Sequence, residues 1–152
     1  MKKNKGKDMS REKKLWNEGW KFLHGDWSEG MNPEYDDNKW YDICIPHSFG
    51  IPYFMEGKFY VGYGCYRKHF TMKKEWTGKR ISLEFQGVFQ EMELYVNGNK
   101  AGEHKGGYTA FVIDITDFTQ PGDNLIFVRV NNLWNPQIAP RAGEHVFNGG
   151  IY

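Results

Sequence analysis

Three stretches of the sequence alternate apolar and polar residues with a period of two. The apolar positions are Ile81, Leu83 and Phe85 in the first stretch, Met92, Leu94 and Val96 in the second, and Ile126, Val128 and Val130 in the third. Successive side chains of a β-strand point to opposite faces, so this period gathers the apolar residues of each stretch on one face. We therefore predict half-buried antiparallel strands, with one face on a core and the other in solvent.

Turn-forming residues separate these strands. Asn97-Gly98 is the preferred pair for a two-residue type I′ hairpin, because both positions need a positive φ. Pro121-Gly122-Asp123 predicts a second tight turn directly before a strand. Further strands are expected near residues 20–24, 40–45, 64–71 and 110–115. The one helix candidate, around residues 10–18, lacks a sustained apolar stripe. The fold class predicted from this pattern is all-β, an antiparallel jelly-roll β-sandwich.

Length and charge limit the classes of partner. The 152 residues suffice for one domain with its own core. Residues 1–14 hold seven Lys and Arg residues and two acids, a balance of +5 that leaves 13 basic and 17 acidic residues, or −4, for the remainder. A mildly acidic folded part argues against nucleic acid as a partner. No apolar run reaches the roughly 20 residues that a membrane span needs, and no signal peptide is visible. We interpret residues 1–15 as a basic, disordered leader.

Motifs of catalysis and of metal binding are missing from the sequence. It contains no GxSxG, P-loop, GxGxxG or HExxH pattern, and its five histidines lack the spacing of a metal site. Glu91 and Glu93 share the solvent face of an expected strand, which does not set two carboxylates across a bound sugar. The sequence thus predicts no catalytic residue, no metal and no cofactor in this chain. Cys44 and Cys65 form no CxxC pattern and are interpreted as buried thiols, with a single bridge between them left open.

Two segments combine aromatic residues with amide and charged side chains. They are IPHSFGIPYF, residues 45–54, and NNLWNPQIAPRAGEHVFNGG, residues 131–150. Sugars offer C–H faces on which aromatic rings stack and hydroxyl groups that amides, guanidinium groups and carboxylates bind. Aromatic residues also fill the cores of β-sandwiches, so composition leaves both carbohydrate binding and core packing open.

Six segments, read in order, carry a resemblance to one family. They are GWKFLHGD, DDNKWYDICIPHSFG, GYGCYRKHFTM, KRISLEFQGVFQEMELYVNGNKAGEHKGGYTAFVIDITDF, GDNLIFVRVNN and PRAGEHVFNGGIY. From about Trp16 to the last residue the sequence resembles the N-terminal sugar-binding domain of family 2 glycoside hydrolases, which include β-galactosidases, β-glucuronidases and β-mannosidases. In that family an arginine and the last strand of the sandwich follow GGIY, then an immunoglobulin-like domain and a TIM barrel with both catalytic glutamates. The resemblance implies that residues 16–152 are the first domain of a longer enzyme, truncated in its last strand.

The resemblance also implies the residues that contact sugar. In the family, the loop before GGIY carries an acid that binds hydroxyl groups of the sugar being cleaved. Seven residues before Ile151 the sequence has Glu144, where relatives usually have Asp. A carboxylate that accepts two hydroxyl groups makes charge-assisted hydrogen bonds. The other candidates for substrate binding are Arg141, His145 and Asn148 nearby, and His47 and Ser48, which are expected to line the same edge.

Two motifs bear on packing. Gly106-Gly107-Tyr108 is expected to form a tight bend with Tyr108 packed as a structural residue. In CYRK, Cys65 stands where relatives usually have Trp, so a neighbour must fill the space or the site is more open.

Three functions remain open from the sequence. The first is the non-catalytic domain of a retaining glycosidase, a β-galactosidase by resemblance, that binds a β-galactoside or related glycan and supports the barrel. The second is a freestanding carbohydrate-binding module or lectin, and the third is a structural interaction domain without a ligand. An unpaired final strand would leave a free sheet edge, so we expect an isolated chain to be marginally stable or to form a homo-oligomer. The sequence does not give the compartment, and family habit alone favours a periplasmic or secreted parent protein.

Overall fold

The computed structural model describes residues 11–51, 60–138 and 148–152. Its strands are β1 (Trp20–His24), β2 (Tyr41–Ile43), β3 (His47–Ser48), β4 (Tyr63–Met72), β5 (Ser82–Phe85), β6 (Val88–Phe89), β7 (Glu91–Val96), β8 (Asn99–Lys105), β9 (Phe111–Asp114), β10 (Gly122–Asn131) and β11 (Gly150–Ile151). Three short 3₁₀ turns join them: η1 (Ser28–Met31), η3 (Lys74–Trp76) and η4 (Thr116–Phe118). In the described ranges there is no α-helix.

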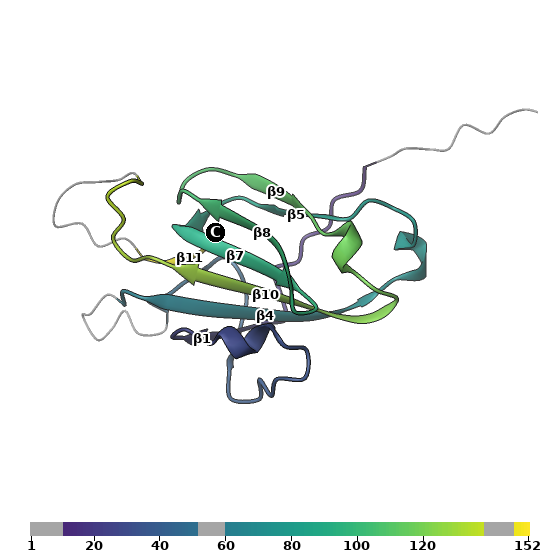
Figure 1. The fold of residues 1–152 in the computed structure, drawn as a ribbon, viewed down its shortest axis with the longest axis horizontal. Helices are drawn as coiled ribbons and strands as arrows, with labels where there is room; N and C mark the ends of the chain where they lie inside the picture. Colours follow the sequence, from purple (N-terminus) through teal and green to yellow (C-terminus); the bar gives the residue numbers. More distant parts are fainter. Residues whose placement is uncertain (1–10, 52–59, 139–147) are drawn as a thin grey trace, which may run out of the picture.

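The strands form one large sheet and two small ones, as Figure 1 shows. The large sheet has the strand order β2-β1-β4-β10-β7-β8, and each of its pairs is antiparallel. The small sheets have the orders β3-β11-β6 and β5-β9, and are also antiparallel. The prediction of an all-β, antiparallel jelly-roll sandwich is confirmed.

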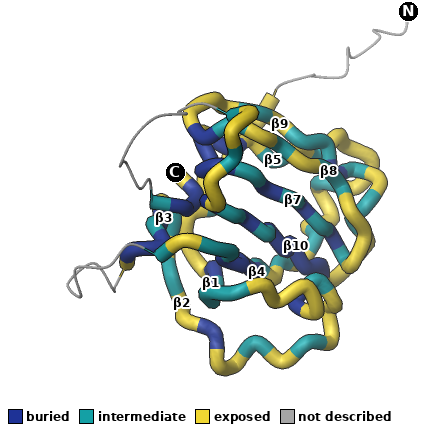
Figure 2. Tube along the Cα trace, turned by 60° about the vertical axis from the view of Figure 1, so that its left-hand side comes forward, coloured by how far each residue is buried: buried dark blue, intermediate teal, exposed yellow. Residues whose placement is uncertain are grey.

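The core lies between the large sheet and the two small ones. The alternation predicted from the sequence recurs in β7, where Met92, Leu94 and Val96 are buried and their neighbours are half-buried. The large sheet contributes most of the core, with residues of the small sheets packed against it: Trp20, Phe22, Tyr66, Met92, Leu94, Val96, Ile126, Val128 and Val130 meet Phe49, Phe85, Val88, Ile115 and Ile151. Figure 2 shows these buried stretches along β4, β7 and β10, with exposed turns around them. The predicted hairpin is also confirmed, since Asn97 and Gly98 have φ values of 51° and 82° between β7 and β8.

Strand β10 departs from the half-buried prediction, because both of its faces are covered. Leu125 and Phe127, on the face away from the main core, are as buried as Ile126 and Val128. The cover comes from residues 26–40, which we call the cover segment. Its Trp40 forms a second apolar cluster with Cys65 and Phe127 on the outer face of the large sheet.

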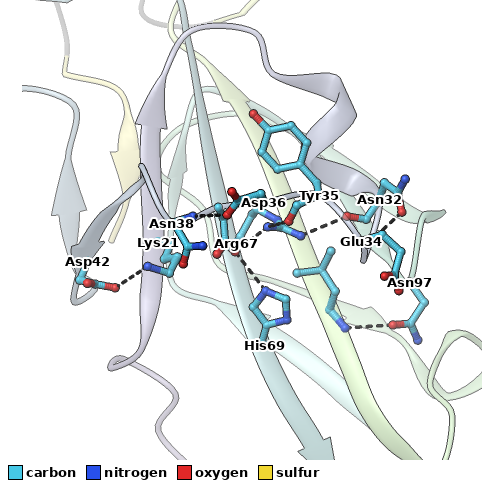
Figure 3. A network of polar contacts seen from close by, with 12 residues as sticks. Lys21, Asn32, Glu34, Tyr35, Asp36, Asn38, Asp42, Arg67, His69 and Asn97 are labelled. Carbon is cyan, nitrogen blue, oxygen red and sulfur yellow. Dashed lines mark hydrogen bonds and ion pairs between the residues drawn. The ribbon is translucent and has the colours of Figure 1, made fainter.

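Arg67 fixes the cover segment to the sheet. Its guanidinium group is fully buried and lies 2.5 Å from Asp37 Oδ2, and it donates hydrogen bonds to the carbonyl oxygens of Tyr35 (3.0 Å) and Asn32 (3.1 Å). The Tyr35 and Trp40 rings flank the guanidinium, with centroids 5.4 and 5.9 Å from its central carbon. Figure 3 shows Arg67 with Tyr35 and Asn32, and the exposed Lys21–Asp42 ion pair. Three of the guanidinium N–H groups donate to these acceptors and Asp37 supplies the counterion, which offsets the cost of burying the charge, whereas Nε has no hydrogen-bond partner among the described residues.

Two packing predictions are wrong. Tyr108 is 67% exposed and is not packed as a structural residue; its ring lies beside that of Phe89, at 5.7 Å between centroids. The expected bend is confirmed, since the chain bends at residues 107 and 108 after Gly106, whose φ is 120°. A Cβ at Gly107 would overlap the Phe89 ring. The interpretation of both cysteines as buried thiols is wrong for Cys44, which is exposed, and correct for Cys65. Both thiols are free, so the bridge that the sequence left open is not formed. Phe127 and Trp40 fill the space beside Cys65.

Candidate functional site

The candidate site lies at the end of the sandwich where β4 and β7 begin and β10 ends, beside the β3-β11-β6 sheet. We call it the site end (Figure 1). Strand β4 begins at Tyr63, opposite Asn131 at the end of β10. The small sheet brings together segments about a hundred residues apart, because Gly150 pairs with Ser48 on one side and with Phe89 on the other. The sheet order thus places predicted site residues from two distant segments side by side.

Two glycines make this pairing sterically feasible. A Cβ at Gly149 would overlap the Phe49 ring, and one at Gly150 would overlap the carbonyl oxygen of His47. The amide of Phe49 donates to the Gly149 carbonyl oxygen at 2.7 Å, which fixes the approach. The GG of GGIY is therefore explained by close contact of backbone with ring and carbonyl groups.

Ser48 on β3 forms a polar cluster with Asn148 and Tyr152, which flank β11. The Tyr152 hydroxyl donates to the Asn148 carbonyl oxygen at 2.8 Å, and the Gly50 amide donates to Ser48 Oγ at 3.3 Å. Partial burial raises the pKa of Tyr152, and its hydrogen bond with the Ser48 side chain opposes this shift. Asn148 Oδ1 is buried and has no hydrogen-bond partner among the described residues. The cluster thus contains an amide oxygen whose capacity to accept a hydrogen bond is unused among the described residues.

His47, in contrast, points into the core. It is 4% exposed, its Nδ1 lies 2.9 Å from the Tyr66 hydroxyl, and its ring packs on Phe22 at 4.4 Å between centroids. Burial lowers the pKa of His47 to about 4, so the imidazole is neutral at pH 7. We therefore leave the His47 side chain out of the sugar contacts proposed below.

Sequence reasoning missed the residues that hold the rim of the site end. Asn132 Oδ1 accepts from the Gly62 amide at 2.8 Å, and its Nδ2 donates to the Tyr60 carbonyl oxygen at 2.8 Å. Glu91 accepts from Asn131 Nδ2 (3.1 Å) and Asn135 Nδ2 (2.9 Å), and Gln90 Nε2 donates to the Leu133 carbonyl oxygen. These bonds fix residues 131–135, which present Trp134 with 73% of its surface exposed. The only sequence signal for this arrangement is the density of Asn after β10.

The predicted site residues fall into three groups. Ser48 and Asn148 are brought together, and a Cβ placed on Gly50 would lie 3.3 Å from Asn148 Oδ1 and 3.7 Å from Ser48 Oγ. His47 is adjacent in sequence but buried. Arg141, Glu144 and His145 lie outside the described residues.

The described residues present hydrogen-bonding groups and aromatic rings. No cluster of three His, Cys, Asp or Glu side chains able to hold a metal ion occurs among them. Within the same ranges no helix has the length and apolar character that crossing a bilayer requires. The arrangement at the site end can bind hydroxyl groups and stack on apolar faces.

Comparisons with known proteins agree with this chemistry. The family model described as "Glycosyl hydrolases family 2, sugar binding domain" matches residues 21–152. A β-galactosidase of Thermoanaerobacter pseudethanolicus is 34% identical over 151 residues, covering 95% of this chain and 20% of that protein. A β-glucuronidase of Bacteroides fragilis is 34% identical over 145 residues, covering 93% of this chain and 20% of that protein.

A solved structure gives the same result for the fold. The Bacteroides uniformis β-glucuronidase 2 structure superposes with a TM-score of 0.84 at 36% identity, covering 91% of this chain and 17% of that one. The chain thus spans about one fifth of the length of the curated relatives named here. Since the family model covers most of its residues, the chain belongs to the sugar-binding domain family of the family 2 glycosyl hydrolases.

Proposed function

We propose that residues 16–152 are the non-catalytic sugar-binding domain of a retaining glycosidase that acts on β-galactosides. The observation that carries this proposal is the pairing of β3 with β11, which brings Ser48 and Asn148 into one polar cluster. Asn148 lies four residues after Glu144 in the sequence. Glu144, Arg141, His145, Asn148 and Ser48 are the proposed contacts. In this proposal residues 1–15 are a leader outside the domain.

Each proposed contact suits a sugar hydroxyl. The Glu144 carboxylate would accept two hydroxyl hydrogen bonds, which are stronger than bonds between neutral groups. Asn148 Oδ1 would accept a third, which would satisfy an oxygen that has no partner among the described residues. Hydrolysis in a retaining glycosidase needs two carboxylates about 5–5.5 Å apart, and we assign these to other domains of the parent protein, which this domain would also support.

The choice of sugar is the finer part of the proposal. Relatives named β-galactosidase and β-glucuronidase are equally similar, each 34% identical. A β-glucuronide carries a carboxylate that Arg141 could pair with in a bidentate geometry, whereas a β-galactoside offers only hydroxyl groups. Hydrolysis of 4-nitrophenyl β-galactoside and β-glucuronide by the parent protein decides between these sugars.

The residue roles are tested in the parent protein by substitution of Glu144. Loss of hydrogen bonds to a charged acceptor, worth about 1.5–3 kcal/mol, predicts that Glu144→Ala lowers kcat/KM by about 10–150-fold. Glu144→Gln keeps the shape and is expected to recover part of this loss. The control is Glu103→Ala, which removes an exposed acid ion-paired with Lys100 on β8. Unchanged kcat/KM in Glu144→Ala would refute the substrate contact.

A freestanding glycan-binding module is the second candidate. The exposed rings of Trp134 and Tyr108, at 73% and 67%, favour it, because such a module presents aromatic rings to its ligand. It predicts measurable glycan affinity in the 152-residue chain alone, by calorimetry with galacto-oligosaccharides. An interaction domain without a ligand would show none.

A further inference from the structure

Cations without an acidic partner gather at the end of the sandwich opposite the site end. Most Lys and Arg side chains in the described ranges lie within 4.0 Å of a carboxylate. The lysines for which no such partner occurs among the described residues are Lys39, Lys68, Lys73, Lys74 and Lys79. Lys68 lies on β4, Lys73 directly follows it, Lys74 begins η3, and Lys79 lies three residues after η3 ends. Strand β4 is ten residues long, so Lys73, Lys74 and Lys79, beyond its last residue, lie about 30 Å from the site end, and Lys68 lies about midway along the strand.

Two indole rings lie among these lysines. Trp16 packs on Phe70 at 4.9 Å and beside Trp76 at 6.1 Å between ring centroids, and both indoles remain partly exposed. Lys14 and Lys73 each place Nζ 5.4 Å from the centroid of the Trp76 ring. We call the surface formed by Lys14, Trp16, Lys68, Lys73, Lys74, Trp76 and Lys79 the basic end.

The lysines of the basic end differ in exposure and in whether their ammonium groups already have a partner. Lys68 is half-buried, and its Nζ donates to the Glu18 carbonyl oxygen, so it is held against the protein. Lys14 is paired with Glu12 and Glu75. Lys73, Lys74 and Lys79 are exposed. Unpaired ammonium groups beside partly exposed indoles are the complement of a ligand with anionic groups on an apolar framework.

We propose that the basic end binds an acidic polysaccharide, a glycan whose pyranose rings carry carboxylate or sulfate groups. The lysines would pair with these anions as point charges, and the edges of the Trp76 and Trp16 rings would contact the C–H faces of the sugars. Nucleic acid fits less well, because its charge density is about one phosphate per 1.7 Å of duplex and the chain beyond residue 14 has a balance of −4. This site is separate from the proposed substrate site, and its test does not depend on hydrolysis.

Affinity electrophoresis of the purified protein tests the proposal. Gels contain polygalacturonate, dextran sulfate, uncharged dextran or no polymer. We expect retardation by at least one of the two acidic polymers, none by dextran, and release as NaCl rises. Reversal of two exposed charges in Lys73→Glu/Lys74→Glu is expected to weaken binding about tenfold or more. Trp76→Ala is expected to weaken it severalfold, with thermal unfolding as a check that the variant folds, and Trp76→Phe to retain most of it.

Matched controls make the result decisive. Lys39→Glu reverses an exposed, unpaired lysine on the cover segment, away from the basic end, and should leave the retardation unchanged. Retardation by polygalacturonate alone or by dextran sulfate alone identifies the anionic group and supports the site. A further gel contains single-stranded DNA. The proposal is overturned by the absence of retardation in both acidic-glycan gels, by equal loss in Lys39→Glu, or by stronger retardation by single-stranded DNA than by either glycan. Full binding by a folded Trp76→Ala variant overturns the sugar contact and leaves only charge attraction.

Discussion

Removal of the Asp37 carboxylate should destabilise the fold far more than removal of an exposed acid. Asp37 is the only anion that contacts the Arg67 guanidinium among the described residues, at 2.5 Å, and the Arg67 side chain has no exposed surface. In Asp37→Ala, the hydrogen bonds to the Tyr35 and Asn32 carbonyl oxygens remain, but the buried charge loses its counterion. Breaking a buried ion pair from one side costs about 3–5 kcal/mol.

The matched control is Asp42→Ala, which breaks the ion pair between Asp42 and Lys21. Lys21 Nζ lies 3.0 Å from Asp42 Oδ1, but the Asp42 side chain is 88% exposed. Exposed pairs contribute about 0–1 kcal/mol, so we expect a difference of at least about 2 kcal/mol between the two variants. Small domains have unfolding free energies of about 5–15 kcal/mol, so Asp37→Ala would remove a large share of the stability.

Urea unfolding followed by tryptophan fluorescence measures this difference. The midpoint should fall strongly in Asp37→Ala and little in Asp42→Ala, with similar slopes if unfolding remains two-state. His69 Nε2 lies 3.0 Å from the same Asp37 oxygen but is 55% exposed, so His69→Ala should resemble the exposed control. Unfolding free energies of Asp37→Ala and Asp42→Ala within about 1 kcal/mol of each other would refute the view that Arg67 depends on a counterion.

Three further predictions concern single side chains. Because the unfolded imidazole takes up a proton near pH 6.5 and the folded His47 only near pH 4, stability should fall by up to about 3 kcal/mol as pH drops through this window. Urea midpoints at pH 7.5, 5.5 and 4.5 measure the fall, and an undiminished slope in His47→Asn would exclude His47 as its source. Gly149→Ala should lower stability by about 1–3 kcal/mol in urea unfolding because its Cβ overlaps the Phe49 ring, and a neutral effect would contradict this contact. Ellman's reagent should modify the exposed Cys44 rapidly and leave Cys65 unreacted until unfolding, because burial raises the pKa of Cys65 to about 12; two fast thiols would contradict this burial.

Most of the longer strands could be predicted from the sequence, whereas the two-residue strands could not. Strands β7 and β10 are six and ten residues long, which is enough for a period of two to appear. Strands β3, β6 and β11 have two residues each, and a period cannot be detected over two positions. Their pairing depends on contacts across about a hundred residues, such as Gly150 with Ser48, which local sequence does not encode.

The cover segment was missed for a different physical reason. Residues 26–40 are rich in acidic and other polar residues, so the sequence indicates a solvated loop. The segment nevertheless buries one face of β10, because Trp40 packs on Phe127 and Asp37 neutralises Arg67. Charged residues are almost never fully buried unless they are paired, so an arginine in a strand would be expected to face solvent. The sequence does not reveal which acid forms the pair.

Part of the candidate site was predicted through resemblance rather than through local pattern. Ser48 and Asn148 do meet, but nothing in their own segments indicates that they face each other. His47 shows the limit of the same reasoning, because alternation along β3 turns it inward while its neighbour Ser48 remains half-exposed. A motif that places two consecutive residues near an edge does not give their side-chain directions.

Strand β4 connects the features described here through its own alternation. Tyr66 points into the core and contacts the His47 ring at the site end, while its neighbour Arg67 points outward to Asp37 in the cover segment. Side chains on opposite faces of one strand share backbone but no side-chain partner, so their substitutions should be nearly additive. Asp37→Ala should therefore lower unfolding stability without changing substrate contacts at temperatures where the protein remains folded. A change in KM of the parent protein at such temperatures would show that the cover segment and the site end are coupled through β4.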